Sequence, residues 1–90
     1  MYQPFATNKF KKDLKRCNRQ NKDMSKLKKI INLLCQGKKL PIRNKDHFLS
    51  GNWASYRECH VEPDWLLIYQ VNTENLLLEL IRLGSHAELF

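Results

Sequence analysis

Three histidines are the residues of this 90-residue chain best suited to proton transfer near neutral pH. They are His47, His60 and His86, and each lies close to aspartate or glutamate in the sequence. The ordinary pKa of imidazole lies near neutrality, so the ring can accept or donate a proton under physiological conditions. Nearby carboxylates stabilise the protonated ring. The three positions therefore indicate general acid and base chemistry.

The basic residues gather in the other half of the chain. Residues 1–45 carry 14 Lys and Arg against two Asp, whereas residues 46–90 carry two Arg against seven acids, within a net charge of +7. Such asymmetry indicates a surface for nucleic acid, a membrane or an acidic protein partner, with a solvated lysine face as the alternative. Together with the histidines it favours acid and base chemistry on nucleic acid.

Composition indicates one globular domain over residues 1–90, since 42% of the residues are hydrophobic and 28% are charged. Three cysteines, Cys17, Cys35 and Cys59, form no Cys-x-x-Cys pair, which predicts buried thiols in a reducing compartment. We find no apolar stretch typical of a signal peptide or a membrane span. We therefore expect a cytoplasmic protein that does not contact membrane.

Two helices are predicted in the basic half. Phe10, Leu14 and Cys17 recur at helical spacing from residue 7 onward, and lysines and arginines surround them. A second apolar repeat predicts a helix over residues 23–36, with Asp at its N-cap and Gly just after its end. Lysines three and four apart on one face of that helix, at positions 22, 26 and 29, repel one another, which favours a bound anion.

Strand-like patterns occur before and after the helices. The segments are residues 2–6, which Pro4 confines to an edge or a strand start, and residues 54–60, 65–71 and 76–83. Tight turns join the last three segments. The predicted fold class is α+β, with two N-terminal helices packed on a small antiparallel sheet in the order β-α-α-β-β-β. Residues 38–53 form a long connection, and such connections are often functional.

Alternation in residues 54–60 places chemically useful side chains on one strand face. Tyr56, Glu58 and His60 share a face, opposite Ser55, Arg57 and Cys59. Strand rise separates Glu58 and His60 by about 6–7 Å, so both can address one phosphate. They are candidate base and co-base.

These residue types suit RNA cleavage without water or metal. A base removes the 2′-OH proton, a cation stabilises the charged phosphorane and an acid protonates the leaving 5′-oxygen, giving a 2′,3′-cyclic phosphate and a 5′-OH. We assign the base to Glu58 or His60 and the acid to His86. Arg82 is the candidate phosphate fork, although a structural salt bridge to one of the nearby glutamates, 58 or 79, is the alternative. No metal or other cofactor is expected, since the histidine spacing matches no short metal motif.

Three motifs in the acid-rich half resemble a known family. They are Lys45-Asp46-His47-x-Leu49-x-Gly51-x-Trp53, Tyr56-Arg57-x-x-His60-Val61-Glu62-Pro63-Asp64-Trp65-x-Leu67-Ile68-Tyr69 and Gly84-x-His86-Ala87-x-Leu89-Phe90. Their order and spacing resemble the YafQ branch of the RelE/ParE superfamily of bacterial toxins. The resemblance implies a RelE-like microbial RNase fold and an mRNA interferase that cuts mRNA on the ribosome. It also implies a cognate antitoxin, through which alone operator DNA would be contacted.

The resemblance carries active-site roles to particular residues. These are His47, His60, Asp64, His86 and Phe90, with His86 as the proton donor and Phe90 as a stacking residue. Glu58 stands where the family has Asp, so its role as base or as orienter of His60 stays open. With Arg82 the expected catalytic set is complete, and Lys45, Arg57 and Phe90 are expected to bind substrate.

Plainer roles compete with some of these assignments. Asp64 follows a proline and suits a turn as well as a histidine partner. Trp53 and Trp65 are interpreted as packing residues, because indole buries a large apolar area. For the whole chain, the alternative is a non-catalytic ParE-like toxin or a basic module that binds the ribosome or RNA, which would need no histidine.

Overall fold

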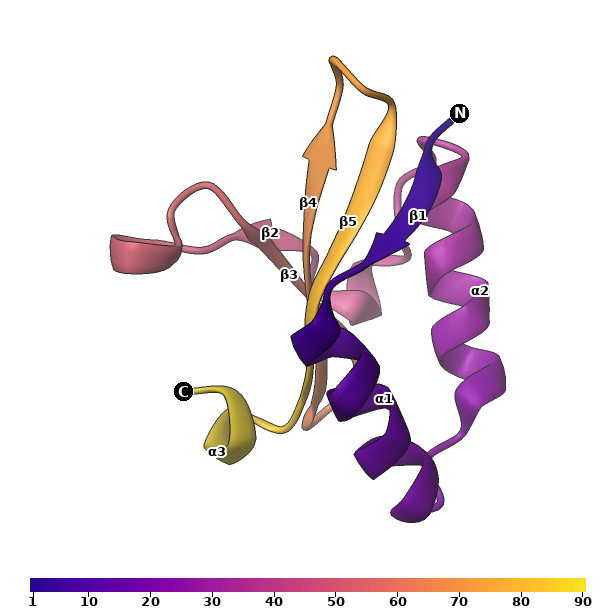
Figure 1. Ribbon diagram of the computed structural model, residues 1–90, viewed down its shortest axis with the longest axis vertical. Coiled ribbons are helices and arrows are strands. Elements are labelled where there is room, and N and C mark those ends of the chain that lie inside the picture. Colours follow the sequence, from indigo (N-terminus) through magenta and orange to yellow (C-terminus); the bar gives the residue numbers. More distant parts are fainter.

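The computed structural model describes residues 1–90 and consists of a five-stranded sheet with two long helices on one side (Figure 1). The strands are β1 (Gln3–Ala6), β2 (His47–Phe48), β3 (Arg57–Glu62), β4 (Trp65–Asn72) and β5 (Leu77–Gly84). The α-helices are α1 (Asn8–Arg19), α2 (Met24–Cys35) and the short α3 (His86–Leu89). Single 3₁₀ turns at Ile42–Asn44 and Gly51–Trp53 flank β2. No helix is long and apolar enough to cross a membrane.

The two long helices form where the apolar repeats predict them. Thr7 caps α1 by accepting a hydrogen bond from the Phe10 amide, and Asp23 caps α2 through the Ser25 amide. Gly37 follows α2 with φ of +70°, a left-handed conformation that costs glycine little. Lys22 lies before the cap of α2, so the predicted three-lysine face of that helix is wrong.

The sheet order is β1-β5-β4-β3-β2. Strands β3, β4 and β5 form the expected antiparallel meander, and β1 lies at an edge as Pro4 requires. The prediction of an antiparallel sheet is wrong at that edge, because β1 pairs parallel with β5. Two short elements were also absent from the predicted order: β2, which adds the other edge, and α3. Two residues and four residues are too few to produce a readable period.

Alternating residues of the central strand face two different surroundings. Trp65, Leu67 and Tyr69 pack toward α1 and α2 in a core of 13 buried residues. Leu66 and Ile68 point the other way into a cluster with Leu89 of α3. Glu58 pairs with Ile68 across the sheet, so it lies on that second surface, which we call the histidine face. One strand therefore serves both the core and the site.

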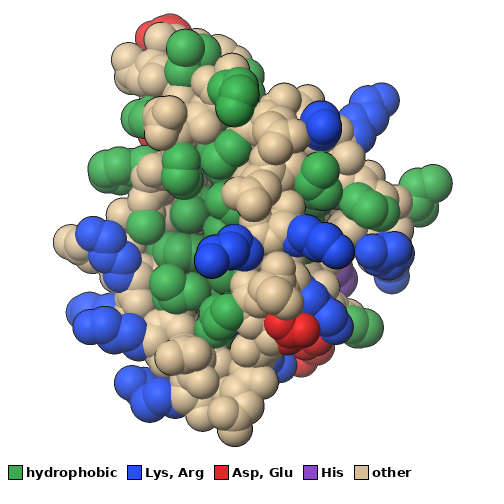
Figure 2. Space-filling model, turned by 90° about the vertical axis from the view of Figure 1, so that its right-hand side faces the viewer, with side chains coloured by type: hydrophobic (Ala, Val, Ile, Leu, Met, Phe, Trp, Pro, Cys, Tyr) green, Lys and Arg blue, Asp and Glu red, His purple; other side chains and the backbone are tan.

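The outer surface of the helices keeps the charge pattern of the basic half. On the side where α2 lies, Figure 2 shows a band of hydrophobic side chains with Lys and Arg on both sides of it. Cys17 and Cys59 are buried and Cys35 is partly buried, and none of the three forms a disulfide. Burial raises the pKa of the Cys59 thiol far above its ordinary value. Cys59 is therefore an inert core residue, as the sequence predicts.

Candidate active site

The site lies on the histidine face, where the β3–β4 turn meets the start of α3. Glu58 and His60 point to this face from β3, as the alternation predicts, and His86 approaches from α3. The rings of His60 and His86 lie with centroids 5.8 Å apart. One side-chain ligand atom from each of Glu58, His60 and His86 lies within 4.8 Å of the others. Three groups that exchange protons thus surround one point.

His86 is paired with Asp64. Its Nδ1 lies 2.9 Å from Asp64 Oδ1, and its backbone amide donates to the same oxygen at 3.1 Å. These hydrogen bonds, the amide first, lower the pKa of Asp64, so the carboxylate stays charged at neutral pH. A charged Asp64 can only accept, so Nδ1 of His86 carries a proton and Nε2 faces away from Asp64. Asp64 therefore fills both roles that the sequence left open: it lies in the β3–β4 turn, and it is the hydrogen-bond partner of His86.

His60 has a neutral partner in the corresponding place. Its Nδ1 lies 3.1 Å from the Pro63 carbonyl oxygen, which can only accept a hydrogen bond. Nδ1 must therefore carry the proton, and in the neutral ring Nε2 keeps its lone pair. Both rings therefore direct Nε2 away from their Nδ1 partners, and they differ in that partner: a carboxylate for His86 and a neutral carbonyl for His60.

Glu58 is the most buried of the candidate residues, at 5% exposed. Its Oε2 lies 3.1 Å from His47 Nε2, while Oε1 is buried without a hydrogen-bond partner. His47 Nδ1 contacts the Lys45 carbonyl, so both ring nitrogens of His47 face oxygen atoms. His47 therefore touches Glu58 and not the other two histidines.

The connection over residues 38–53 supports the site in two ways. It carries His47 on β2, which pairs directly with Glu58 of β3. It also carries Asn44, a buried residue whose side chain donates to the His60 carbonyl oxygen at 2.6 Å. Lys45 in the same segment is exposed and contacts His47 through its backbone alone.

A clamp from α1 holds α3 in place. Ser85 and Glu88 form a capping box, in which each side chain bonds the other residue's backbone amide. Glu88 also lies 3.1 Å from the side chains of Arg16 of α1 and of Gln20, which follows α1. Arg16 Nη2 also donates a hydrogen bond to the Leu83 carbonyl oxygen at 2.7 Å. The helix that carries His86 is therefore fixed to α1 on the other side of the sheet.

Gly84 permits this close approach. A Cβ at Gly84 would lie 2.6 Å from Arg16 Nη2 and 3.2 Å from Leu89 Cδ2. No larger residue fits there without moving the clamp.

Arg82 is held away from the histidines by Asp13. Its Nε donates to Asp13 Oδ2 at 2.7 Å, so its partner is neither of the glutamates weighed from the sequence. Burial of Asp13 acts to raise its pKa, but hydrogen bonds from Arg82, the Leu83 amide and Arg16 outweigh it and lower the pKa. Arg82 still reaches a hollow that Trp53 and Tyr56 line. The structure thus brings Arg82 near the aromatic rim of the site without contact to the three acid–base groups.

Arg57 lies on the face opposite Glu58 and His60. Its Nε contacts Asp46 and the Tyr69 hydroxyl, each at 3.2 Å, and its guanidinium covers the Phe48 ring at 4.2 Å. Burial and the Asp46 hydrogen bond raise the pKa of Tyr69. In this arrangement Arg57 braces β2 against β3 and does not face the site.

An aromatic group borders His86. The exposed Phe90 ring lies 6.4 Å from His86 and 5.7 Å, edge to face, from Trp53. Trp53 also packs at 5.6 Å on Tyr56, so its role as a packing residue holds. The sequence does not predict that Trp53 and Tyr56 form an aromatic rim beside Phe90. The available signal was the position of Trp53 in the long connection. Trp65 is fully buried in the core, as predicted.

Fold and site agree with the comparison to known proteins. Residues 2–90 match the family model described as bacterial toxin of type II toxin-antitoxin system, YafQ. The chain is thus a type II toxin. It is 46% identical over 82 residues, 90% of this chain and 87% of the relative, to the mRNA interferase toxin YafQ of Escherichia coli (strain K12). It belongs to the YafQ family.

Solved structures of relatives have the same α+β fold. A metal-bound toxin from Helicobacter pylori superposes with a TM-score of 0.95 at 41% identity, covering 100% of both chains. YafQ in the Escherichia coli DinJ-YafQ complex superposes with a TM-score of 0.89 at 42% identity, covering 100% of this chain and 99% of the other.

Proposed function

We propose that this chain is an mRNA interferase, an endoribonuclease that cuts mRNA on the ribosome in the cytoplasm without a metal ion. The pairing of His86 with Asp64, opposite a His60 whose Nε2 is free, carries the proposal. One ring is arranged to donate a proton and the other to accept one, as cleavage through the 2′-OH requires. The name of the Escherichia coli relative, mRNA interferase toxin, supports the same reaction.

In the proposed reaction His60 Nε2 removes the 2′-OH proton, and the resulting alkoxide attacks the adjacent phosphorus. The P–O5′ bond breaks as His86 Nε2–H protonates the leaving oxygen, which yields a 2′,3′-cyclic phosphate and a 5′-OH. Glu58, buried beside His60, stabilises His60 when it becomes imidazolium, and His47 keeps Glu58 in position. Asp64 stabilises protonated His86 before transfer.

The remaining predicted residues take substrate roles in this proposal. Phe90, exposed beside Trp53, stacks on a base next to the cut. Arg82 and Lys45 contact phosphates from the edge of the site. Arg57 acts indirectly by bracing β2, because it faces away from the histidines.

The test is to map RNA ends after expression of the chain and after expression of His86→Ala. We expect 5′-OH and cyclic phosphate ends at defined codons, with cleavage reduced about 10²–10⁴-fold in the variant. Purified material free of other nucleases is the control. Intact transcripts with arrested growth would support the non-catalytic alternative, a toxin that blocks a target by binding.

We further propose that a cognate antitoxin covers the apolar band flanked by basic residues in Figure 2. Acidic and apolar side chains on a partner segment would complement it. The Escherichia coli relative is solved in complex with DinJ, which supports a protein partner of this kind.

Metal binding is a second candidate activity. Glu58, His60 and His86 offer an oxygen and two imidazole nitrogens around one point, a donor set that suits Zn²⁺ or Cu²⁺. The metal-bound Helicobacter pylori toxin supports it. A bound ion would occupy the lone pair of His60 and the proton site of His86, so we expect it to inhibit cleavage. Cleavage with added Zn²⁺, then with chelator, measures this; activity that rises with metal contradicts it.

A further inference from the structure

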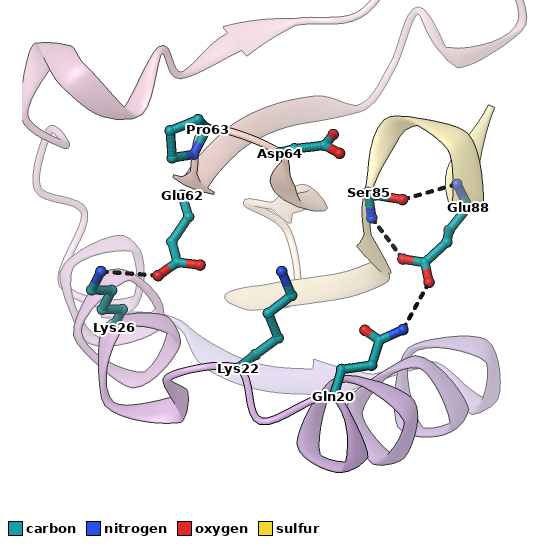
Figure 3. Close-up of a pocket in the computed structure, with 8 residues that line it drawn as sticks. All are labelled: Gln20, Lys22, Lys26, Glu62, Pro63, Asp64, Ser85 and Glu88. Atoms are coloured by element: carbon teal, nitrogen blue, oxygen red, sulfur yellow. Dashed lines mark hydrogen bonds and ion pairs between the residues drawn. The ribbon is translucent and has the colours of Figure 1, made fainter.

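A polar pocket lies directly beside the acid–base groups, and of its lining residues only Asp64 takes part in the mechanism above. It has a volume of about 470 Å³. Its lining residues are all polar or proline: Gln20, Lys22, Lys26, Glu62, Pro63, Asp64, Ser85 and Glu88 (Figure 3). They come from the α1–α2 connection, the start of α2, the β3–β4 turn and the α3 cap. Asp64 and Ser85 belong both to this pocket and to the support of His86.

Lys22 is the distinctive residue of this pocket. It is the one lysine of the chain that is partly buried, since every other lysine is exposed. Its Nζ lies 5.9 Å above the ring of the fully buried Trp65, and Figure 3 shows it directed into the pocket. This distance lies within the range of a cation–π contact, which favours the observed position of the ammonium.

The acids that line the pocket do not neutralise Lys22. Glu62 pairs with Lys26 at 2.9 Å, and Glu88 is held by α1 and the capping box. Asp64 pairs with His86. Lys22 makes no ion pair within 4.0 Å, and the hydrogen bonds from His86, together with the charge of Lys22 at longer range, lower the pKa of Asp64. A single anionic group with several acceptor oxygens fits this arrangement.

We propose that the Lys22 pocket binds a backbone phosphate of the RNA strand on the 3′ side of the cut. The inference rests on the proposed function, because it takes His86 as the group that protonates the 5′-oxygen. The 5′-oxygen belongs to the first nucleotide on the 3′ side of the cut. In this proposal the strand runs on from that nucleotide past His86 and Asp64. The pocket lies immediately beyond Asp64, and its Lys22, Gln20 and Ser85 can donate to a phosphate.

Substrates with a single cleavable position test the proposal. A 2′-O-methyl strand with one ribonucleotide can be cut at one bond only, and it is made with either one or three nucleotides beyond that bond. The added phosphates should raise kcat/KM of the unmodified protein about tenfold. Lys22→Met keeps an unbranched side chain of similar length but removes the charge, so it should lose this gain. Lys22→Arg should keep most of it.

The matched control is Lys38→Met, which changes net charge equally. Lys38 follows the far end of α2, a helix of 12 residues that is about 18 Å long. It should keep the full gain from the added nucleotides. Lys22→Met should also weaken the salt dependence of binding. The slope of log K against log salt concentration should fall by about 0.7, the value for one phosphate contact on a single strand.

Binding separates this inference from the proposed function. Fluorescence anisotropy with fully 2′-O-methylated strands needs no cleavage, and the strand with three 3′ nucleotides should bind Lys22→Met about tenfold more weakly. If that loss is seen while the protein cuts no RNA, the subsite stands and the nuclease assignment fails.

Three results would overturn the subsite. The first is a Lys22→Met variant that keeps the full gain from added 3′ nucleotides. The second is a defect seen only with ribosomes present, which would assign the phosphate to ribosomal RNA. The third is unchanged RNA binding with weakened antitoxin binding, which would assign Lys22 to an antitoxin carboxylate.

Discussion

The two faces of the sheet divide stability from chemistry within the same strands. On the face covered by α1 and α2, Cys59 and Leu67 belong to a core of 13 buried residues. On the histidine face, only Leu66, Ile68 and Leu89 are buried apolar residues. Polar groups surround that small cluster. A side-chain period of two therefore lets a single strand serve the core and the site with adjacent residues.

Substitutions on the two faces should therefore affect different properties of the protein. Substitutions on the covered face should change the free energy of unfolding, and those on the histidine face should change the rate of reaction. Asp13, Arg16 and Arg82 join the two faces, because they fix α1 to the strand that precedes His86. Variants at these contacts should affect both quantities.

The largest expected effect is on the histidine face. His60→Ala removes the proposed base, so single-turnover cleavage should slow about 10²–10⁴-fold. His60 is partly exposed and its side chain makes one hydrogen bond, so the free energy of unfolding should change by less than about 1 kcal/mol. Quenched single-turnover assays measure the cleavage rate, and urea unfolding measures the free energy of unfolding. A variant that cuts normally would remove His60 as the base and return that role to Glu58.

Leu67→Ala should give the reverse result on the covered face. Leu67 is fully buried, and loss of its side chain leaves a cavity that costs about 2–5 kcal/mol. Cleavage per folded molecule should be unchanged. Urea unfolding and cleavage at low temperature measure both; a slow but stable variant would contradict the division between faces.

Asp13→Asn should affect both faces. It removes the charge that Arg82 and Arg16 share, at a cost of about 1–3 kcal/mol. Because the folded pKa of Asp13 lies below 3.8, its stabilisation is present at neutral pH and is lost as pH falls through the folded value. Urea unfolding at pH 7 and at pH 3 should therefore show the variant's deficit shrinking in acid. An equal deficit at both values would contradict this origin.

Gly84→Ala should have the smallest effect. The new methyl group displaces Arg16 from the Leu83 carbonyl, at about 1 kcal/mol of stability for one hydrogen bond. Movement of α3 should slow cleavage by about tenfold or less. Thermal unfolding and cleavage rates measure it. Unchanged values would mean that Arg16 is not needed to position α3.

Much of the fold follows from local patterns. The periods of Phe10, Leu14 and Cys17, and of the strands after residue 56, predict the elements that form. Long-range pairing does not follow from such patterns, so the parallel contact of β1 with β5 was missed. Glu58 and His60 were correctly placed on one face, because strand alternation is a local rule.

The partner of Arg82 shows the limit for the site. Arg82 is joined to Asp13, 69 positions away, a separation that no spacing rule reaches. A signal existed, since Asp13 lies three residues after Phe10 and four before Cys17, on the apolar side of α1. An acid in that position requires a buried partner. The spacing of the lysines likewise predicts Lys22 on the same helix face as Lys26, whereas Lys22 lies in the loop before α2.

The parallel pairing of β1 with β5 has a consequence for synthesis of the protein. Thr7, at the end of β1, donates to the carbonyl of Ile81, 74 positions later. The sheet order cannot be completed until β5 has left the ribosome, and His86 follows β5 directly. A nascent chain therefore carries no assembled site while most of it is being translated, and interrupted products of this toxin should be inactive.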